Sequence, residues 1–408
     1  MKLAILFDNL GPYHQARIAA AAGQLSVVAI GFGKTSAEYA WESQEDARFP
    51  TLLVNPHGPG RALAAAEFQL RLNETLSQAA PDVVAVPGWS GRGAFCSMLW
   101  ALSHRKPIVL MSESTAWDEA RSGWKEWIKC RIVGLASAGL VGGTPHAAYL
   151  RQLGMEEAQI FLGYDVVEND YFSTSADQVR SAEPGATRPY FLASNRFIAK
   201  KNLFRLLSAY AAYRQAAAAR GHAVWDLCLL GDGALKPQLL AHAEALELPM
   251  QAGAPWDQLP QSQGGMVYLP GFRQIAELPK FYARAGIFVH ASTSEQWGLV
   301  VNEAMAAGLP VLVSQKVGCA QDLVHPGRNG AVFDPENEAE LAAWLGKFSD
   351  PQFQLERYGA ASREIIQAWS PARFATGMSA AVASALAAGP RAARWWERAL
   401  LTLLSKRS

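Results

Sequence analysis

The 408-residue sequence contains only four cysteines, and these are scattered along the chain. Cys96, Cys130, Cys228 and Cys319 form no C-x-x-C pair and have no set of histidines near them. A disulfide framework or a zinc site requires closer and more regular spacing. We therefore expect buried free thiols in a reducing compartment.

Long apolar runs and an excess of charge are also missing. No stretch of 18 apolar residues occurs, so we expect no segment that crosses a membrane. The N-terminal stretch MKLAILFDNLGPYHQ turns polar after a short apolar run, which predicts a first strand and not a signal peptide. The 37 basic and 36 acidic side chains nearly cancel, so the overall charge does not indicate a nucleic-acid partner.

Two motifs common in nucleotide-dependent enzymes are absent. No G-x-G-x-x-G follows the first expected strand, so a dinucleotide site is not supported. No D-x-D lies at the end of an expected strand, and we therefore predict that no metal ion takes part in the chemistry.

Half of the residues are apolar, and the chain is too long for one ordinary core, so we expect two domains. Short apolar runs that alternate with helical patterns predict an α/β fold with doubly wound parallel sheets. The expected domains comprise residues 1–172 and 189–370, joined by a polar linker at 173–188, with terminal helices within 371–408. Strands are expected at 3–7, 26–30, 51–54, 83–86, 108–111, 139–141, 190–193, 226–230, 266–269 and 286–290. The clearest helices are expected at 13–22, 62–78, 94–104, 203–218, 235–246, 276–283, 299–307 and 370–386.

The stretch at residues 289–335 concentrates the chemistry of the sequence. It contains Glu295 and Glu303, separated by seven residues, with Gly298 between them. Glu295 should follow a strand and Glu303 should lie early in the next helix. Open α/β sheets bind ligands at the carboxyl ends of their strands, and the free N–H groups of a helix start suit a phosphate.

Glu295 and Glu303 form the E-x7-E pattern of retaining glycosyltransferases of the GT-B fold, and the surrounding sequence resembles family 4 (glycosyl transferases group 1). The resemblance extends from residue 190 to about residue 386 and is weak in the first half. It implies two Rossmann-like domains facing across a cleft, with the nucleotide sugar bound by the second domain and the acceptor by the first. It also implies a terminal helix that packs back towards the first domain.

Arg196 and Lys201, in SNRFIAKKN, match the R-x4-K pair of the family, whose members contact the diphosphate. Negative charge grows on the phosphates as the sugar leaves, so fixed cations are needed there. Arginine offers a planar fork and lysine a point charge, and both suit phosphate oxygens. Lys200 is adjacent, but the spacing favours Lys201; Asn202 replaces a glycine that is frequent in the family.

The resemblance gives roles to the residues of the central stretch. Glu295 reaches hydroxyls of the donor sugar, and Glu303 holds the ribose, because a carboxylate can accept from two vicinal hydroxyls. The backbone near Gly298, Leu299 and Val300 is expected to meet the phosphate.

Two further turns belong to the same expected site. Gly231, Asp232 and Gly233 resemble the G-[DE]-G turn that approaches the nucleotide, although a plain tight turn explains them equally well. Gly271 and Phe272 lie where the family places the base.

The acceptor side is less clear. Many family members have a histidine at the position that Glu113 occupies here. Glu113 is expected either to accept a hydrogen bond from an acceptor hydroxyl or to cap the next helix. His14, with Arg17 one turn further on, is a candidate for binding acceptor or phosphate, and a structural histidine is the alternative. His146 and His290 are weaker candidates of the same kind.

Three tryptophans, Trp117, Trp124 and Trp127, interleave with basic residues, and the tail RAARWWERALLTLLSKRS predicts a basic amphipathic helix. These patterns suit contact with anionic lipid, while a helix buried on the first domain is the alternative for the tail. We expect a cytoplasmic protein, with peripheral contact at the inner face of the membrane left open. The interleaved basic residues are Arg121, Lys125, Lys129 and Arg131.

The sequence therefore predicts a retaining, metal-independent glycosyltransferase of the hexosyltransferase type, with no cofactor and no nucleic-acid partner. Its donor would be a nucleotide-diphosphate sugar of the UDP or GDP type. Its acceptor would be a hydroxyl of a glycan or lipid-linked glycan in polysaccharide biosynthesis. A nucleotide-sugar epimerase of the same fold and a catalytically silent glycan- or nucleotide-binding protein stay open as alternatives.

Overall fold

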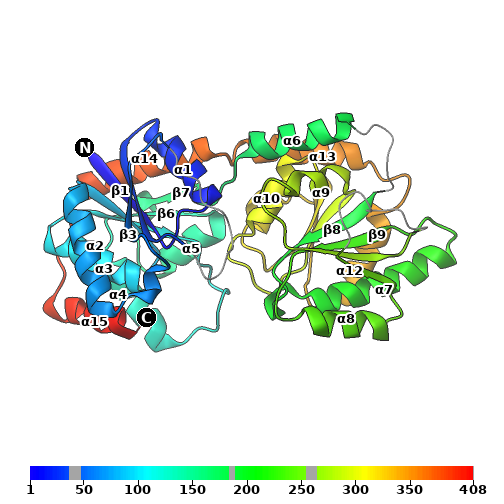
Figure 1. The fold of residues 1–408 in the computed structure, drawn as a ribbon, viewed down its shortest axis with the longest axis horizontal. Coiled ribbons are helices and arrows are strands. Elements are labelled where there is room, and N and C mark those ends of the chain that lie inside the picture. The colour runs from blue at the N-terminus through cyan, green and yellow to red at the C-terminus, as the bar shows by residue number, and fades with distance from the viewer. Residues whose placement is uncertain (36–46, 183–188, 254–263, 408) are drawn as a thin grey trace. The chain divides into compact units, whose positions relative to one another are not determined.

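The computed structural model of the chain describes residues 1–35, 47–182, 189–253 and 264–407 (Figure 1). Within these residues the chain forms two compact units. The first combines Met1–Glu168 with Trp369–Ser408, and the second is Asn169–Ala368. Each unit contains one parallel sheet of seven strands with helices on both faces. The predicted α/β architecture with two doubly wound domains is confirmed.

The first sheet has the strand order β3-β2-β1-β4-β5-β6-β7. Every residue of the central strands β5 and β6 is buried, as expected for parallel strands that are covered on both faces. The strands are β1 (Lys2–Phe7), β2 (Ser26–Gly33), β3 (Thr51–Asn55), β4 (Val83–Pro87), β5 (Ile108–Ser112), β6 (Ala138–Val141) and β7 (Ile160–Leu162).

Two groups of helices cover this sheet (Figure 1). Helices α1 and α14 pack together, and α14 contacts β5, β6 and β7, while α2 and α3 lie on the other face and α15 packs on α3. The helices are α1 (Pro12–Ala22), α2 (Ala65–Ala79), α3 (Arg92–Ser103), α4 (Gly123–Val133), α5 (Thr144–Gln152), α14 (Pro371–Ala388) and α15 (Trp395–Arg407).

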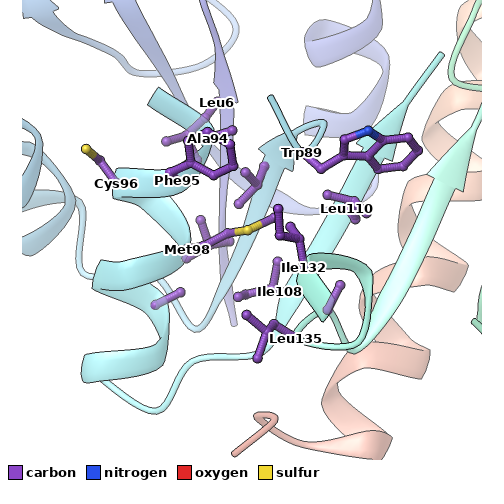
Figure 2. Close-up of a cluster of buried hydrophobic side chains, with 14 of the residues drawn as sticks. Leu6, Trp89, Ala94, Phe95, Cys96, Met98, Ile108, Leu110, Ile132 and Leu135 are labelled. Atoms are coloured by element: carbon purple, nitrogen blue, oxygen red, sulfur yellow. The ribbon is translucent and has the colours of Figure 1, made fainter. Parts of the chain in front are cut away.

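The core between β5 and α3 shows how the sequence pattern produces this packing (Figure 2). Ile108 and Leu110, two positions apart on β5, lie among the side chains of this cluster with Met98 from α3. Alternate residues of a strand share one face, so the spacing of two directs both side chains into the same layer. All three residues are no more than 1% exposed.

The second sheet has the order β10-β11-β9-β8-β12-β13-β14. Helices α7, α8 and α12 cover one face, and α6, α9, α10 and α13 cover the other (Figure 1). The strands are β8 (Tyr190–Ser194), β9 (Asp226–Leu230), β10 (Met250–Ala252), β11 (Val267–Gly271), β12 (Ile287–His290), β13 (Val311–Ser314) and β14 (Gly330–Phe333). The helices are α6 (Asn169–Ala182), α7 (Leu203–Ala219), α8 (Lys236–Ala245), α9 (Leu278–Arg284), α10 (Leu299–Ala306), α11 (Ala320–Leu323), α12 (Glu338–Phe348) and α13 (Leu355–Gln367).

The predicted linker at 173–188 is wrong for residues 173–182, which continue the helix α6. Phe172 and Ala176 are buried on one face of this helix, and α6 packs on α9 and α10 of the second unit. The segment is polar because its other face is solvated, and this masked the helical period in the sequence. Residues 183–188 lie outside the described residues. The chain returns from the second unit to the first at Trp369, directly before α14.

Candidate active site

The predicted donor-binding residues gather at the carboxyl edge of the second sheet. The strand order reverses between β8 and β12, and ligands of open α/β sheets bind at such a switch point. Backbone hydrogen bonds join the loops after these strands: Asn195 N–H donates to the Leu230 carbonyl at 2.9 Å, and Thr293 N–H to the Lys200 carbonyl at 2.8 Å. The loops that carry Arg196, Lys201 and Glu295 therefore form one surface.

The glycines of the Gly231–Gly233 turn are required by the backbone alone. Gly231 has a φ of +133° and Gly233 a φ of +156°. A Cβ on Gly231 would lie 1.9 Å from the Asn195 carbonyl oxygen, and one on Gly233 would lie 2.8 Å from Phe197 N. The turn thus packs against the loop that carries Arg196, which accounts for the glycines whether or not a nucleotide binds there.

Asp232 itself points away from this packing. It is exposed and forms an ion pair with Lys236 at 2.8 Å, and the hydrogen bond from Lys236 lowers the pKa of the aspartate. Its predicted contact with the donor stays a prediction.

Gly271 and Phe272 lie next to the glycine turn. Gly231 N–H donates to the Gly271 carbonyl at 3.1 Å, and Gly271 has a φ of +90°. The ring of Phe272 is 42% exposed, so a large apolar side chain is presented to solvent beside the turn. A flat base is a suitable occupant, and the predicted base contact remains open.

Glu295 is the centre of the charged cluster. Its carboxylate pairs with Lys201 and, at 3.4 Å, with Lys200, while His290 Nε2 lies 3.6 Å from Oε2. The Ser292 hydroxyl donates to Oε2 at 3.4 Å. Burial by itself would raise the pKa of Glu295, but the hydrogen bond from His290 and the charge of Lys201 outweigh it and hold that pKa well below its usual range.

Burial lowers the pKa of Lys201, and the charge of Glu295 offsets part of this effect. The charges of Lys200 and Arg196 lower the pKa of Lys201 further, which places all three cations near one another. Lys201 is only 9% exposed, whereas Arg196 is partly exposed. Such clustered cations repel one another and are stabilised by an anion, as a diphosphate site requires.

Helix α10 begins directly beside this cluster. Its first turn follows Gly298, which has a φ of +98°, and no side chain caps the helix. Leu299 and Val300 are partly exposed, so their backbone lies near the surface. The helix N-terminus is positive and suits an anion, but the predicted phosphate contact is not tested by this geometry alone.

Glu303 is buried on α10, with only 1% exposure. The hydroxyl of Tyr282 on α9 donates to Glu303 Oε2 at 2.8 Å. Tyr282 was missed from the sequence, because it is 21 positions away and comes from another helix. The predicted ribose contact of Glu303 remains a prediction.

On the acceptor side, the structure opposes one of the predictions for the first unit. Arg17 is 1% exposed; it donates to the Val166 carbonyl at 3.2 Å and pairs with Asp165 at 3.5 Å. These contacts give Arg17 a structural role, and its burial argues against direct phosphate binding. His14 stacks on Phe7 with ring centroids 4.0 Å apart, and desolvation, with the charge of Arg17, lowers its pKa to about 3. Its side chain is partly exposed, so its predicted contact with acceptor or phosphate stays a prediction.

Glu113 follows β5 and is partly exposed. The alternative that it caps the next helix is wrong, because α4 begins at Gly123 with Ser122 at its N-cap. Burial and the charge of Glu113 raise the pKa of Asp165 well above its usual value. Asp165 was missed from the sequence because its partners are distant along the chain. His146 is buried and accepts from Gly143 N–H at 3.1 Å, a structural contact.

The basic residues near α4 are largely neutralised. Lys129 pairs with Glu119 at 2.6 Å and Glu126 at 3.2 Å, and Arg121 pairs with Asp118 and, at 3.5 Å, with Glu126. The expected basic patch of residues 117–131 therefore has compensating acids at Arg121 and Lys129. These acids reduce the positive charge of the segment, and its expected contact with anionic lipid stays a prediction.

Aromatic side chains remain exposed in the same region of the first unit. Trp124 is 66% exposed and Trp395, at the start of α15, is 81% exposed. Trp127 and Trp396 stack with ring centroids 5.9 Å apart, and the Arg131 guanidinium lies 5.5 Å from the centre of the Trp127 ring. Helix α15 is thus packed on the first unit and still presents large apolar groups to solvent.

Neither a metal cluster nor a membrane-spanning helix is found in the described ranges. No three or more His, Cys, Asp or Glu side chains come together there in a way that would hold a metal ion. None of the helices in these ranges is both long enough and apolar enough to cross a bilayer. The four cysteines are free, and three of them are buried.

Comparison with known proteins extends the sequence resemblance. Residues 188–349 match the family model described as glycosyl transferases group 1. A sulfoquinovosyl transferase, SQD2, of Arabidopsis thaliana is 36% identical over 97 residues, which are 23% of this chain and 19% of that protein. A D-inositol 3-phosphate glycosyltransferase of Streptomyces scabiei is 38% identical over 86 residues, 21% of this chain and 19% of that protein. The matches thus span about a fifth of the length of these curated relatives.

Solved structures resemble almost the whole chain. Anabaena Alr3699/HepE, solved in complex with UDP, has a TM-score of 0.70 and 18% identity, with coverage of 94% of this chain and 100% of that one. A sucrose-phosphate synthase from Thermosynechococcus elongatus has a TM-score of 0.71 and 19% identity, with coverage of 95% and 100%. At these identities the likeness shows the fold, and it confirms the predicted GT-B architecture.

Proposed function

Because this chain has the GT-B fold and its residues 188–349 match the group 1 glycosyltransferases, we propose that it is a retaining glycosyltransferase. Its donor is a nucleotide-diphosphate sugar of the UDP or GDP type, and its acceptor is a hydroxyl of a glycan or lipid-linked glycan. The observation that carries the proposal is the cluster of Glu295, Lys200 and Lys201 at the switch point of the second sheet, beside the N-terminus of α10.

The cluster supports a specific division of work. Arg196 and Lys201 stabilise the negative charge that develops on the diphosphate as the bond to the sugar breaks. Glu295 holds hydroxyls of the sugar, since the low pKa of its carboxyl keeps it an acceptor at neutral pH. These cations supply the positive charge that a divalent metal provides in other enzymes, so the proposed transfer is metal-independent. Retention of configuration rests on the family resemblance.

The acceptor is proposed to meet the first unit at Glu113. This carboxylate is partly exposed after β5 and accepts hydrogen bonds, as a hydroxyl nucleophile requires. The curated relatives have different names, a sulfoquinovosyl transferase and a D-inositol 3-phosphate glycosyltransferase. The shared domain therefore does not set the substrate, and a glycan acceptor in polysaccharide biosynthesis remains our proposal.

We place the enzyme in the cytoplasm, with peripheral contact at the membrane. The exposed Trp124 and Trp395 support this contact, since aromatic rings suit the interface of a bilayer. The tail supplies the positive charge, because residues 389–408 contain five basic side chains and one acid. The acids near α4 reduce the electrostatic contribution of that segment.

A panel of nucleotide sugars separates the proposed function from its alternatives. Purified protein is mixed with UDP- and GDP-sugars, and thermal stability is measured, because a ligand that binds the folded state raises the melting temperature. Stabilising donors are then incubated with and without glycan acceptors, and the products are analysed. Transfer that needs an acceptor supports the proposal, conversion of the donor sugar alone indicates an epimerase, and binding without turnover indicates a silent binding protein.

A further inference from the structure

His290 is the last residue of β12 and is completely buried. Its Nε2 lies 3.6 Å from Glu295 Oε2 and 3.4 Å from the Ser292 hydroxyl. Its other ring nitrogen, Nδ1, is buried and has no hydrogen-bond partner among the residues that the structure describes. Nε2 is therefore the one ring nitrogen with polar neighbours among the described residues, and these are the Ser292 hydroxyl and the Glu295 carboxylate.

These contacts fix the protonation of the ring. A lone pair on Nε2 would face the negative Glu295 carboxylate 3.6 Å away, so Nε2 carries the proton. The shorter contact of Nε2 is the one to the Ser292 hydroxyl at 3.4 Å, a long hydrogen bond. The hydrogen bond from His290 is one of the causes that lower the pKa of Glu295. Burial lowers the pKa of His290 itself, and the charges of Lys200 and Lys201 oppose its protonation while Glu295 favours it. The imidazole is neutral at pH 7.

Lys201 has two candidate partners. Its ammonium group pairs with Glu295, although the proposed diphosphate would occupy the same cation. Lys200, the other cationic partner, is more exposed, with 36% of its side chain accessible. When the donor binds, Glu295 would therefore lose its ion pair with Lys201. At this same step its carboxylate must hold the sugar.

We propose that His290 is a positioning residue that keeps the Glu295 carboxylate directed at the donor sugar after Lys201 has turned to the diphosphate. This inference rests on the proposed function, because it assigns Glu295 to a sugar. A Cβ on Gly298 would lie 3.5 Å from His290 Nε2, so the ring is also adjacent to the start of α10. His290 thus lies between the Glu295 carboxylate and the start of α10.

A purely structural role explains this histidine poorly. Phe288 stacks on it with ring centroids 6.2 Å apart, and an apolar residue would fill the same space without a buried nitrogen that lacks a partner. Residues that serve function at the expense of stability have this property. Replacement by leucine should therefore leave the fold intact and remove only the direction of Glu295.

The first experiment compares His290→Leu, His290→Gln and His290→Asn. The amide of glutamine can place an N–H near the position of Nε2, whereas that of the shorter asparagine cannot. We expect His290→Leu and His290→Asn to lower kcat/KM for the nucleotide sugar about tenfold. This is about the fold-change expected from the loss of one hydrogen bond to a charged group. The Kd of UDP should change less than about twofold, and His290→Gln should restore most of the activity.

The outcomes separate the role from general damage. A parallel loss of UDP affinity and turnover, or a lower melting temperature in His290→Leu, would mean that the ring only supports the fold. Unchanged kcat/KM in His290→Leu of an active enzyme would overturn the role of His290 alone. Absence of turnover by the wild-type chain with every nucleotide sugar would overturn the proposed function, and the sugar-directing role with it.

A second experiment needs no substrate. Histidine labelled with ¹⁵N reports which ring nitrogen carries the proton, and His290→Gln assigns the signal among the eight histidines. The expected state at pH 7 is neutral, with the proton on Nε2. A proton on Nδ1, or a doubly protonated ring, would overturn the proposed hydrogen bond to Glu295. His146→Gln, in the first unit, serves as the control and should leave the His290 signal unchanged.

Discussion

Two adjacent lysines allow a sharp test of the donor site. Lys201→Ala and Lys200→Ala each remove one positive charge from the same loop and from the same partner, Glu295. They differ in burial, since the side chain of Lys201 is 11% exposed and that of Lys200 is 36% exposed. We expect Lys201→Ala to abolish most of the activity and Lys200→Ala to reduce it only slightly.

The magnitudes follow from this difference in burial. Loss of a charged contact that stabilises the developing phosphate charge raises the barrier by about 2–4 kcal/mol, or roughly 30- to 1,000-fold in rate. Truncating one partner of a buried ion pair costs about 3–5 kcal/mol of stability. Glu295 keeps His290 and Lys200, so we expect a smaller loss, about 2 kcal/mol. An exposed pair contributes about 0–1 kcal/mol, so Lys200→Ala should lower the rate less than about fivefold.

The assay measures kcat/KM with the best donor of the panel, the Kd of UDP by calorimetry, and thermal unfolding of each variant. Circular dichroism checks that Lys201→Ala is folded at the assay temperature. Lys201→Arg should retain part of the UDP affinity, because the charge remains while the geometry changes. If Lys200→Ala loses as much activity as Lys201→Ala or more, the assignment of Lys201 to the diphosphate is wrong.

Four further predictions concern other parts of the chain. Gly231→Ala should lower the melting temperature by several degrees, because its Cβ would collide with Asn195; an unchanged melting curve would contradict the packing argument. Transfer should survive EDTA, and a loss that magnesium restores would reveal a metal site. Trp124→Ser and Trp395→Ser should each reduce co-sedimentation with anionic vesicles at low salt. If the wild-type protein binds neither anionic nor neutral vesicles, a soluble acceptor is favoured. The free energy of unfolding should decrease as the pH falls below about 6.5, because the pKa of His290 is lower in the folded chain than in the unfolded one. His290→Gln should make the free energy of unfolding depend less on pH. Urea titrations at several pH values measure this dependence.

Local patterns in the sequence determined the elements and the donor-side loops. Mostly apolar runs of three to five residues marked the ten expected strands, all of which are present, because a parallel strand buried on both faces has a nearly continuous apolar sequence. The E-x7-E pattern also placed Glu295 after a strand and Glu303 on the following helix, since a strand end, a glycine and a helix start lie within 14 residues. These patterns lie within short stretches of sequence, so neighbouring residues are enough to predict the strands and the loop that carries Glu295.

Only the tertiary structure decided which side chains meet. Arg17 read as a candidate phosphate ligand until the fold paired it with Asp165, 148 positions away. Tyr282 contacts Glu303 from another helix, and His290 became important only through its distance to Glu295. Likewise, the helical pattern of α6 was not recognised, because one face of this helix is polar. Its opposite face is buried and contacts α9. Charge and burial depend on neighbours that the folded chain brings together, and no short stretch of sequence contains that information.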